Sequence, residues 1–87
     1  MMNIEVTRTF IKLYRKLDPD LKLQVKKTLR LFQENPLRPS LYNKKIAGQS
    51  NIYEIRVSRN YRITYSKSGD LILLRKVGTH DILKKPQ

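Results

Sequence analysis

The chain has 87 residues, with 19 lysines and arginines, seven aspartates and glutamates, no cysteine and a formal net charge of +12. A chain of this length is expected to form one small domain, residues 1–87, and without cysteine it has no disulfide, thiolate metal site or thiol nucleophile. Because 39% of the residues are hydrophobic, the charge indicates a folded basic module whose partner is a polyanion. Nucleic acid is the first candidate, and an anionic membrane or an acidic protein would satisfy the same charge.

The start of the chain predicts a protein of the cytoplasm. Residues 1–6 lack the basic flank and apolar stretch of a signal peptide, and the apolar runs, such as residues 71–74, are too short to span a bilayer. We therefore expect no contact with the membrane. The first expected element is a short strand at residues 4–6, in which apolar residues alternate with Glu5.

Two helices are expected next, as a hairpin. Thr7 or Thr9 can cap the first helix, and Asp18-Pro19-Asp20 provides a cap, a first-turn proline and a first-turn acid for the second. The second helix is expected to end at Asn35-Pro36. The apolar side chains recur with helical spacing and are Phe10, Leu13, Tyr14 and Leu17 in the first helix and Leu21, Val25, Leu29 and Phe32 in the second.

The second half of the chain has the two-residue period of strands. Residues 36–51 carry no sustained period and are expected to form a long connection that scattered apolar side chains attach to the core. Beyond them, alternation predicts strands at 52–57, 61–65 and 71–77. The order of elements predicts an α+β fold, in which an N-terminal strand and a helical hairpin pack on an antiparallel sheet completed by a three-stranded C-terminal meander.

The first hairpin of this meander brings two arginines together. A three-residue loop at 58–60 pairs Ile55 with Ile63 on the core side of the sheet. On the other face it sets Arg56 opposite Arg62.

The second hairpin is expected to add a third arginine. A two-residue loop at Ser68-Gly69 sets Arg62 opposite Arg75, so that three guanidinium groups form a row across three strands. Guanidinium groups match the geometry of phosphate, and a sheet holds them more rigidly than a loop does. The row predicts a phosphate-binding face, and the alternative is a basic face that is simply solvated.

His80 is the only histidine and follows the last predicted strand, near the expected arginine row. Histidine titrates near neutrality and can transfer protons, which suits the cleavage of RNA beside cations that stabilise the phosphate. A surface histidine without a role is the alternative. Glu54 and Asp81 are candidates to orient the imidazole or to act as a base, and a plain salt bridge is a further role for Glu54. With one histidine and no cysteine, we expect no metal and no other cofactor.

Several segments carry a recognisable pattern. They are Lys44–Gly48, the strand 52–57, the Tyr-Arg-Ile-Thr-Tyr segment at 61–65 and the ending Val77-Gly78-Thr79-His80-Asp81. Together with the early strand and the helical hairpin, these segments resemble the RelE/ParE superfamily of bacterial and archaeal toxins from type II toxin–antitoxin systems. The Gly-Thr-His ending is most similar to the YafQ-type branch of ribosome-dependent mRNA interferases.

The resemblance implies a RelE-like fold and roles for individual residues. It implies that His80 is catalytic, that Arg56 and Arg62 contact phosphate, and that Lys44 and Lys45 hold RNA or the ribosome. Three further residues near the arginines are predicted to contact RNA or phosphate: Arg59, Tyr61 and Arg75.

The leading prediction is therefore a toxin that cleaves mRNA on the ribosome without a metal ion. An antitoxin protein is expected to restrain it by wrapping the helices or covering the basic face. One alternative is a ParE-like inhibitor of DNA gyrase without nuclease activity, which would share the fold and the charge. Another is an RNA-binding module without enzymatic activity.

Overall fold

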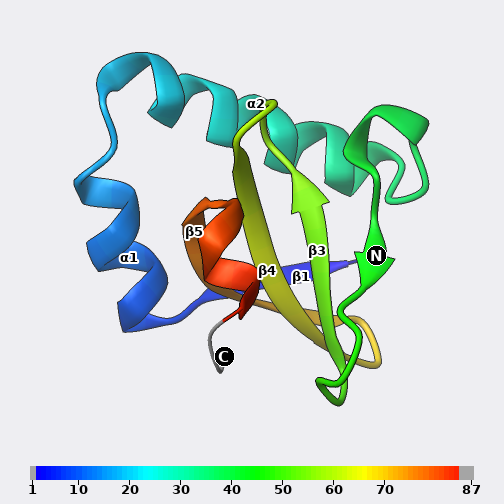
Figure 1. Ribbon diagram of the computed structural model, residues 1–87. Coiled ribbons are helices and arrows are strands. Elements are labelled where there is room, and N and C mark those ends of the chain that lie inside the picture. The colour runs from blue at the N-terminus through cyan, green and yellow to red at the C-terminus, as the bar shows by residue number, and fades with distance from the viewer. Residues whose placement is uncertain (1, 85–87) are drawn as a thin grey trace.

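The computed structural model describes residues 2–84, in which two helices cover one face of a five-stranded sheet (Figure 1). The elements are β1 (Asn3–Val6), α1 (Arg8–Arg15), α2 (Pro19–Glu34), η1 (Pro39–Leu41), β2 (Lys44–Lys45), β3 (Ile52–Arg56), β4 (Tyr61–Ser68), β5 (Leu71–Thr79) and η2 (His80–Lys84), where η marks a 3₁₀ helix. The α+β class and the RelE-like arrangement predicted from the sequence are confirmed.

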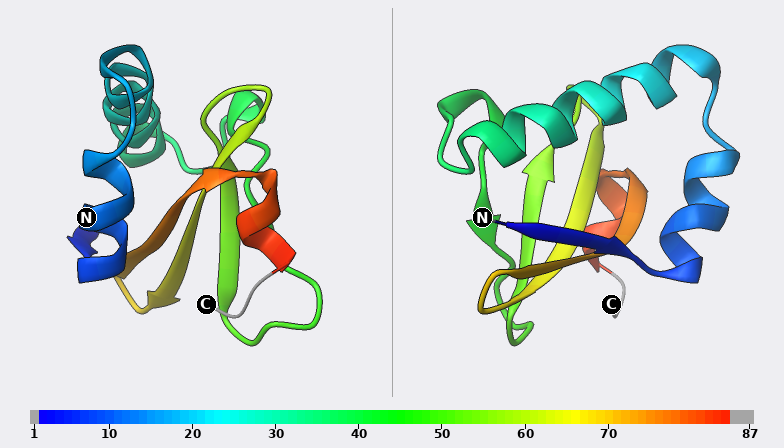
Figure 2. Two further views of the ribbon diagram at one scale, coloured as in Figure 1. Left: turned by 60° about the vertical axis from the view of Figure 1, so that its left-hand side comes forward. Right: turned by 180° about the vertical axis from the view of Figure 1, so that it is seen from behind.

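Both long helices begin at the predicted caps. The hydroxyl oxygen of Thr7 accepts a hydrogen bond from the Phe10 amide at 3.1 Å, and Asp18 accepts one from the Leu21 amide at 2.9 Å. Each bond satisfies one of the amides that a helix leaves unpaired at its start. The helical hairpin is open, since α1 stands at a steep angle to α2 (Figures 1 and 2).

The sheet has the order β1-β5-β4-β3-β2. β1 pairs with β5 in parallel, whereas the other neighbours are antiparallel, so the expected antiparallel sheet is limited to β2–β5. β2 lies within the predicted connection 36–51 and pairs through only two residues. A strand of two residues has too few positions to display a period, which is why the sequence did not predict it.

The hydrophobic core lies between α2 and the sheet. The Phe32 ring lies 5.1 Å from the Tyr65 ring, which marks the side of the sheet that faces α2. Cross-strand partners point to the same side, so Tyr53, opposite Tyr65, shares this side and stacks on it at 5.3 Å. The largest fully buried apolar side chains are Val25, Phe32, Leu41, Ile55, Ile63, Ile72, Leu74 and Val77.

The register of the second hairpin differs from the prediction. Arg62 lies opposite Gly78 and not opposite Arg75, so the predicted row of three arginines is wrong. Consecutive residues Thr64 and Tyr65 pair with Lys76 and Leu74, which makes Arg75 the extra residue of a β-bulge. The bulge lets Leu74 and Val77 both be buried although three positions separate them, an odd spacing that strict alternation forbids.

The turn of this hairpin is also displaced by one residue. Ser68 pairs with Leu71, so Gly69 and Asp70 form the loop in place of the predicted Ser68 and Gly69. Gly69 has a φ of +58°, a left-handed conformation that glycine adopts without a steric penalty.

Candidate functional site

The candidate site lies on the face of the sheet turned away from α2, which we call the polar face. Alternation along the strands brings Glu54, Arg62, Thr64 and Gly78 to this face. Glu54 is only 6% exposed and Thr64 is fully buried. A carboxylate is buried in a folded protein when it has a partner, so this region requires specific polar contacts.

Arg62 provides the partner for Glu54. Its Nε atom lies 3.8 Å from a carboxylate oxygen of Glu54, and both side chains are largely buried. Its Nη1 atom donates to the backbone oxygens of Ser58 at 2.9 Å, Tyr61 at 3.0 Å and Arg59 at 3.2 Å. The Arg62 guanidinium group therefore braces the β3–β4 turn by bonding to three of its backbone carbonyls.

Arg56, the last residue of β3, also contacts the β3–β4 turn. Its Nε atom donates to the Ser58 carbonyl at 3.3 Å, and its guanidinium group lies 5.0 Å from the centre of the Tyr42 ring. The predicted pairing of Arg56 with Arg62 is confirmed by the register. The two guanidinium groups, which would repel each other, are held together because both donate to one carbonyl oxygen.

His80 is attached to this turn through its backbone. Its amide donates to the Asn60 carbonyl at 3.0 Å, one residue beyond the pair formed by Tyr61 and Thr79. The His80 side chain is exposed, and Asp81 follows it as another exposed residue of η2. The backbone of His80 and the two arginines therefore lie at the same end of the sheet.

A close contact holds η2 against the polar face. A Cβ atom on Gly78 would lie 2.9 Å from Cγ2 of Ile82, so only glycine permits this approach. Because Gly78 opposes Arg62, Ile82 covers the same face as Arg62. The Gln49 side-chain amide donates to the Leu83 carbonyl at 3.3 Å and ties η2 to the loop before β3.

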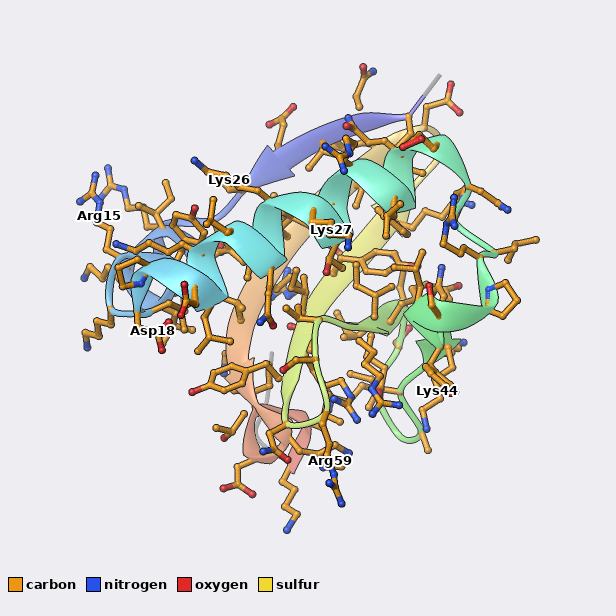
Figure 3. All side chains as sticks on the ribbon, turned by 90° about the horizontal axis from the view of Figure 1, so that it is seen from above. Arg15, Asp18, Lys26, Lys27, Lys44 and Arg59 are labelled. Carbon is orange, nitrogen blue, oxygen red and sulfur yellow. The ribbon has the colours of Figure 1, made fainter. Side chains whose placement is uncertain are left out.

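The other predicted site residues have no side-chain role in this cluster. Arg59 is exposed in the β3–β4 turn, next to the cluster, as Figure 3 shows. Lys44 and Lys45 form β2 at the edge of the sheet, opposite Glu54 and Tyr53 respectively. Tyr61 lies two positions before Ile63 in β4 and therefore points to the face of the sheet that faces α2. Arg75 is the extra residue of the bulge in β5.

Some contributors to the cluster had no signal in the sequence. Ser58 acts through its carbonyl and Tyr42 through a ring that stacks on Arg56 across 14 positions of the chain, and neither interaction follows a local pattern. Gly78 lies inside β5, which extends beyond the strand predicted at 71–77, and a glycine inside a strand indicates a close approach by another part of the chain.

Burial also changes the acidity of one tyrosine on the α2 side. Burial raises the pKa of the Tyr65 hydroxyl above its ordinary value of 10.0, the hydrogen bond to Asn43 opposes this effect, and Tyr53 adds to the rise. The hydroxyl donates to Oδ1 of Asn43 at 2.7 Å.

Within residues 2–84, no group of three or more histidine, aspartate or glutamate side chains is arranged to hold a metal ion. Within the same range, no helix combines the length and apolar character needed to cross a bilayer.

Solved structures of other proteins share the fold of this chain. The chain is 29% identical to a chain in the RelB–RelE antitoxin–toxin complex from Methanococcus jannaschii, over 91% of this chain and 93% of that one, with a TM-score of 0.73. This chain belongs to the RelE/ParE toxin superfamily. YafQ from E. coli strain BL21(DE3) has a similar fold, with 20% identity over 98% of this chain and 100% of that one and a TM-score of 0.75. The YoeB/ParE toxin from Agrobacterium tumefaciens is also similar in fold, with 16% identity over 91% of this chain and 99% of that one and a TM-score of 0.73. Protein-family models and curated proteins, compared by sequence, give no match.

This RelE/ParE fold assembles the groups that acid–base chemistry on a phosphate needs. This end of the sheet carries the exposed residue His80 and the partly buried arginines Arg56 and Arg62, and the exposed Arg59 lies in the β3–β4 turn. Guanidinium groups stabilise negative charge that grows on phosphate oxygens, and an imidazole can accept or donate a proton.

Proposed function

We propose that the protein is the toxin of a type II toxin–antitoxin system and acts as a metal-independent endoribonuclease on mRNA bound to the ribosome. Membership of the RelE/ParE superfamily supports the toxin role. The observation that carries the nuclease activity is the hydrogen bond from the His80 amide to Asn60, because it joins the only histidine to the turn that Arg56 and Arg62 brace.

The proposed reaction is an attack of the RNA on itself. The 2′-oxygen loses its proton, forms a bond to the adjacent phosphorus, and the bond from phosphorus to the 5′-oxygen breaks. The products are a 2′,3′-cyclic phosphate and a free 5′-hydroxyl, which takes up a proton. His80 transfers a proton at one of these two oxygens, and Arg56 stabilises the charge on the phosphate.

The acids take different parts in this proposal. Glu54 holds Arg62 through the 3.8 Å ion pair and thereby positions the turn. Asp81 follows His80 directly and is exposed, so it can orient the imidazole or accept a proton. The group proposed to take the proton from the 2′-hydroxyl is therefore His80 or Asp81.

We propose three partners: a cognate antitoxin, mRNA and the ribosome. The antitoxin is supported by the toxin–antitoxin complexes among the similar structures, RelB–RelE from Methanococcus jannaschii and DinJ–YafQ from E. coli. The RNA partners are supported by the net charge of +12, which favours binding to polyanions through the release of counterions.

The test is a comparison of His80→Ala with Lys84→Ala, which changes another exposed residue of η2. Each variant and the wild type are expressed without an antitoxin, growth is followed, and the 5′ ends of messages on translating ribosomes are mapped. We expect His80→Ala to lower cleavage by about 10²- to 10⁴-fold, the range of general acid–base catalysis, at an unchanged melting temperature. Lys84→Ala is expected to cleave as the wild type does.

Two results would contradict the proposal. One is full cleavage by His80→Ala, which would leave the imidazole without a catalytic role. The other is growth arrest by the wild type with intact messages and accumulating DNA breaks, which would indicate a ParE-like action on gyrase.

A further inference from the structure

A pocket that the proposed reaction does not use opens beside Arg56. It has a volume of about 380 Å³ and lies between α2, η1 and the end of β3. Its polar side chains are Gln24, Lys27, Thr28, Ser40 and Arg56, and its apolar lining consists of the buried Leu41 and the partly buried Leu31 and Val57. None of the described residues that line it is acidic.

The cations of this pocket are suited to an anion. Arg56 is held in one orientation, because its Nε atom donates to Ser58 and its guanidinium group lies on the Tyr42 ring. A guanidinium group has five N–H donors, so its two Nη atoms retain donors for an anion. Lys27 is exposed on α2 and adds a second positive charge from the opposite wall.

The remaining lining suits a nucleobase. The partly buried Leu31 and Val57 present an apolar surface, and the Gln24 amide provides one donor group and one acceptor group that can bond to the edge of a base. The volume falls at the lower end of the range for small-molecule sites, about 300–1,000 Å³.

We propose that this pocket is a nucleotide subsite, which takes the nucleotide unit next to the scissile phosphate of the RNA. Lys27 and Arg56 bind its phosphate, Leu31 and Val57 contact its base, and Gln24 bonds to the base edge. The nature of the ligand rests on the proposed nuclease function. Arg56 joins the two sites, since it lies both in the pocket and at the turn that binds His80.

The chain offers a matched control for Lys27. Lys26 is its neighbour on α2 and is also exposed, but it lines the apolar groove between α1 and α2. The two lysines project from different sides of α2 (Figure 3). Lys26→Ala and Lys27→Ala change the net charge equally, so a difference between them isolates the effect of the pocket.

The experiment measures binding of a short RNA that carries a 2′-deoxy sugar at the cleaved position and therefore stays intact. We expect Lys27→Ala to weaken binding by about five- to tenfold and to lower the slope of log affinity against log salt by about 1, as for the loss of one phosphate contact. Lys26→Ala is expected to bind as the wild type does. With one neighbouring phosphate replaced by an uncharged methylphosphonate, wild type and Lys27→Ala are expected to bind equally.

Three results would overturn the subsite. They are equal losses for the two lysine variants, a loss for Lys27→Ala that no single methylphosphonate removes, and an unchanged RNA affinity for Lys27→Ala together with weaker binding of an acidic partner protein. The binding test needs no cleavage. It would therefore establish that the pocket binds an RNA nucleotide even if His80→Ala showed the nuclease proposal to be wrong, and only the position of that nucleotide beside a cleaved phosphate would then be lost.

Discussion

The two faces of the central sheet are built from alternate residues of the same strands, yet one face buries apolar side chains and the other buries polar ones. Toward α2, Ile55 and Ile63 are fully buried and contribute to a continuous apolar core. On the polar face, Glu54 and Thr64 are buried just as deeply, and Glu54 is paired with Arg62. Apolar burial tolerates many arrangements, whereas a buried carboxylate requires one particular partner.

The faces also differ in what covers them. α2 has 16 residues and presents an apolar stripe to one face. The polar face is covered by the five residues of η2 and the loop before β3, which lie on the other side of the sheet from the helices (Figure 2). A short cover with few apolar contacts opens more easily than a long helix, so access to the proposed site is expected to come from this side.

The core face can be tested with the largest expected effect. Ile63→Ala removes a fully buried side chain and is expected to lower the free energy of unfolding by about 2–5 kcal/mol, measured by urea denaturation. Leu23→Ala is the control, because Leu23 is 64% exposed and its change is expected to stay within about 0.5 kcal/mol. A loss under 1 kcal/mol for Ile63→Ala would contradict the assignment of the core.

The polar face can be tested by Glu54→Gln. The variant leaves Arg62 without its carboxylate, and we expect a loss of about 1–3 kcal/mol in the free energy of unfolding. Cleavage per folded molecule is expected to fall much less than in His80→Ala, because the amide can still bond to the guanidinium group. Full stability with abolished cleavage would instead make Glu54 a member of the reacting groups.

A smaller effect is expected for Tyr65→Phe, which removes the hydrogen bond to Asn43 and costs about 1 kcal/mol at neutral pH. The raised pKa of Tyr65 adds a dependence on pH. Above the ordinary tyrosine pKa of 10.0 and below the raised one, the folded state keeps a proton that the unfolded state has lost, so stability falls as pH rises.

Urea denaturation between neutral and alkaline pH measures this slope. Tyr65→Phe is expected to lose stability less steeply than the wild type as the pH rises above 10.0. Equal alkaline slopes in the two proteins would show that the Tyr65 hydroxyl does not contribute.

Sequence-based predictions were correct where an element depends on residues that are close together in the chain. The starts of both helices and the pairing of Arg56 with Arg62 were predicted, because a cap and a three-residue loop depend on neighbours a few positions away. The pairing of Arg62 with Arg75 was wrong, because a bulge breaks the alternation that the prediction extended. The role of His80 in catalysis stays a prediction.

Local patterns in the amino-acid order thus determined the class of fold, the element boundaries at the caps and the identity of the charged candidates. Only the folded chain decided which of these candidates meet. His80 reaches the β3–β4 turn because its amide donates to the Asn60 carbonyl, and the Tyr42 ring reaches Arg56 across 14 positions of the chain. Such contacts join residues on different strands and turns, and their geometry depends on every element between them, so no short-range period in the chain encodes them.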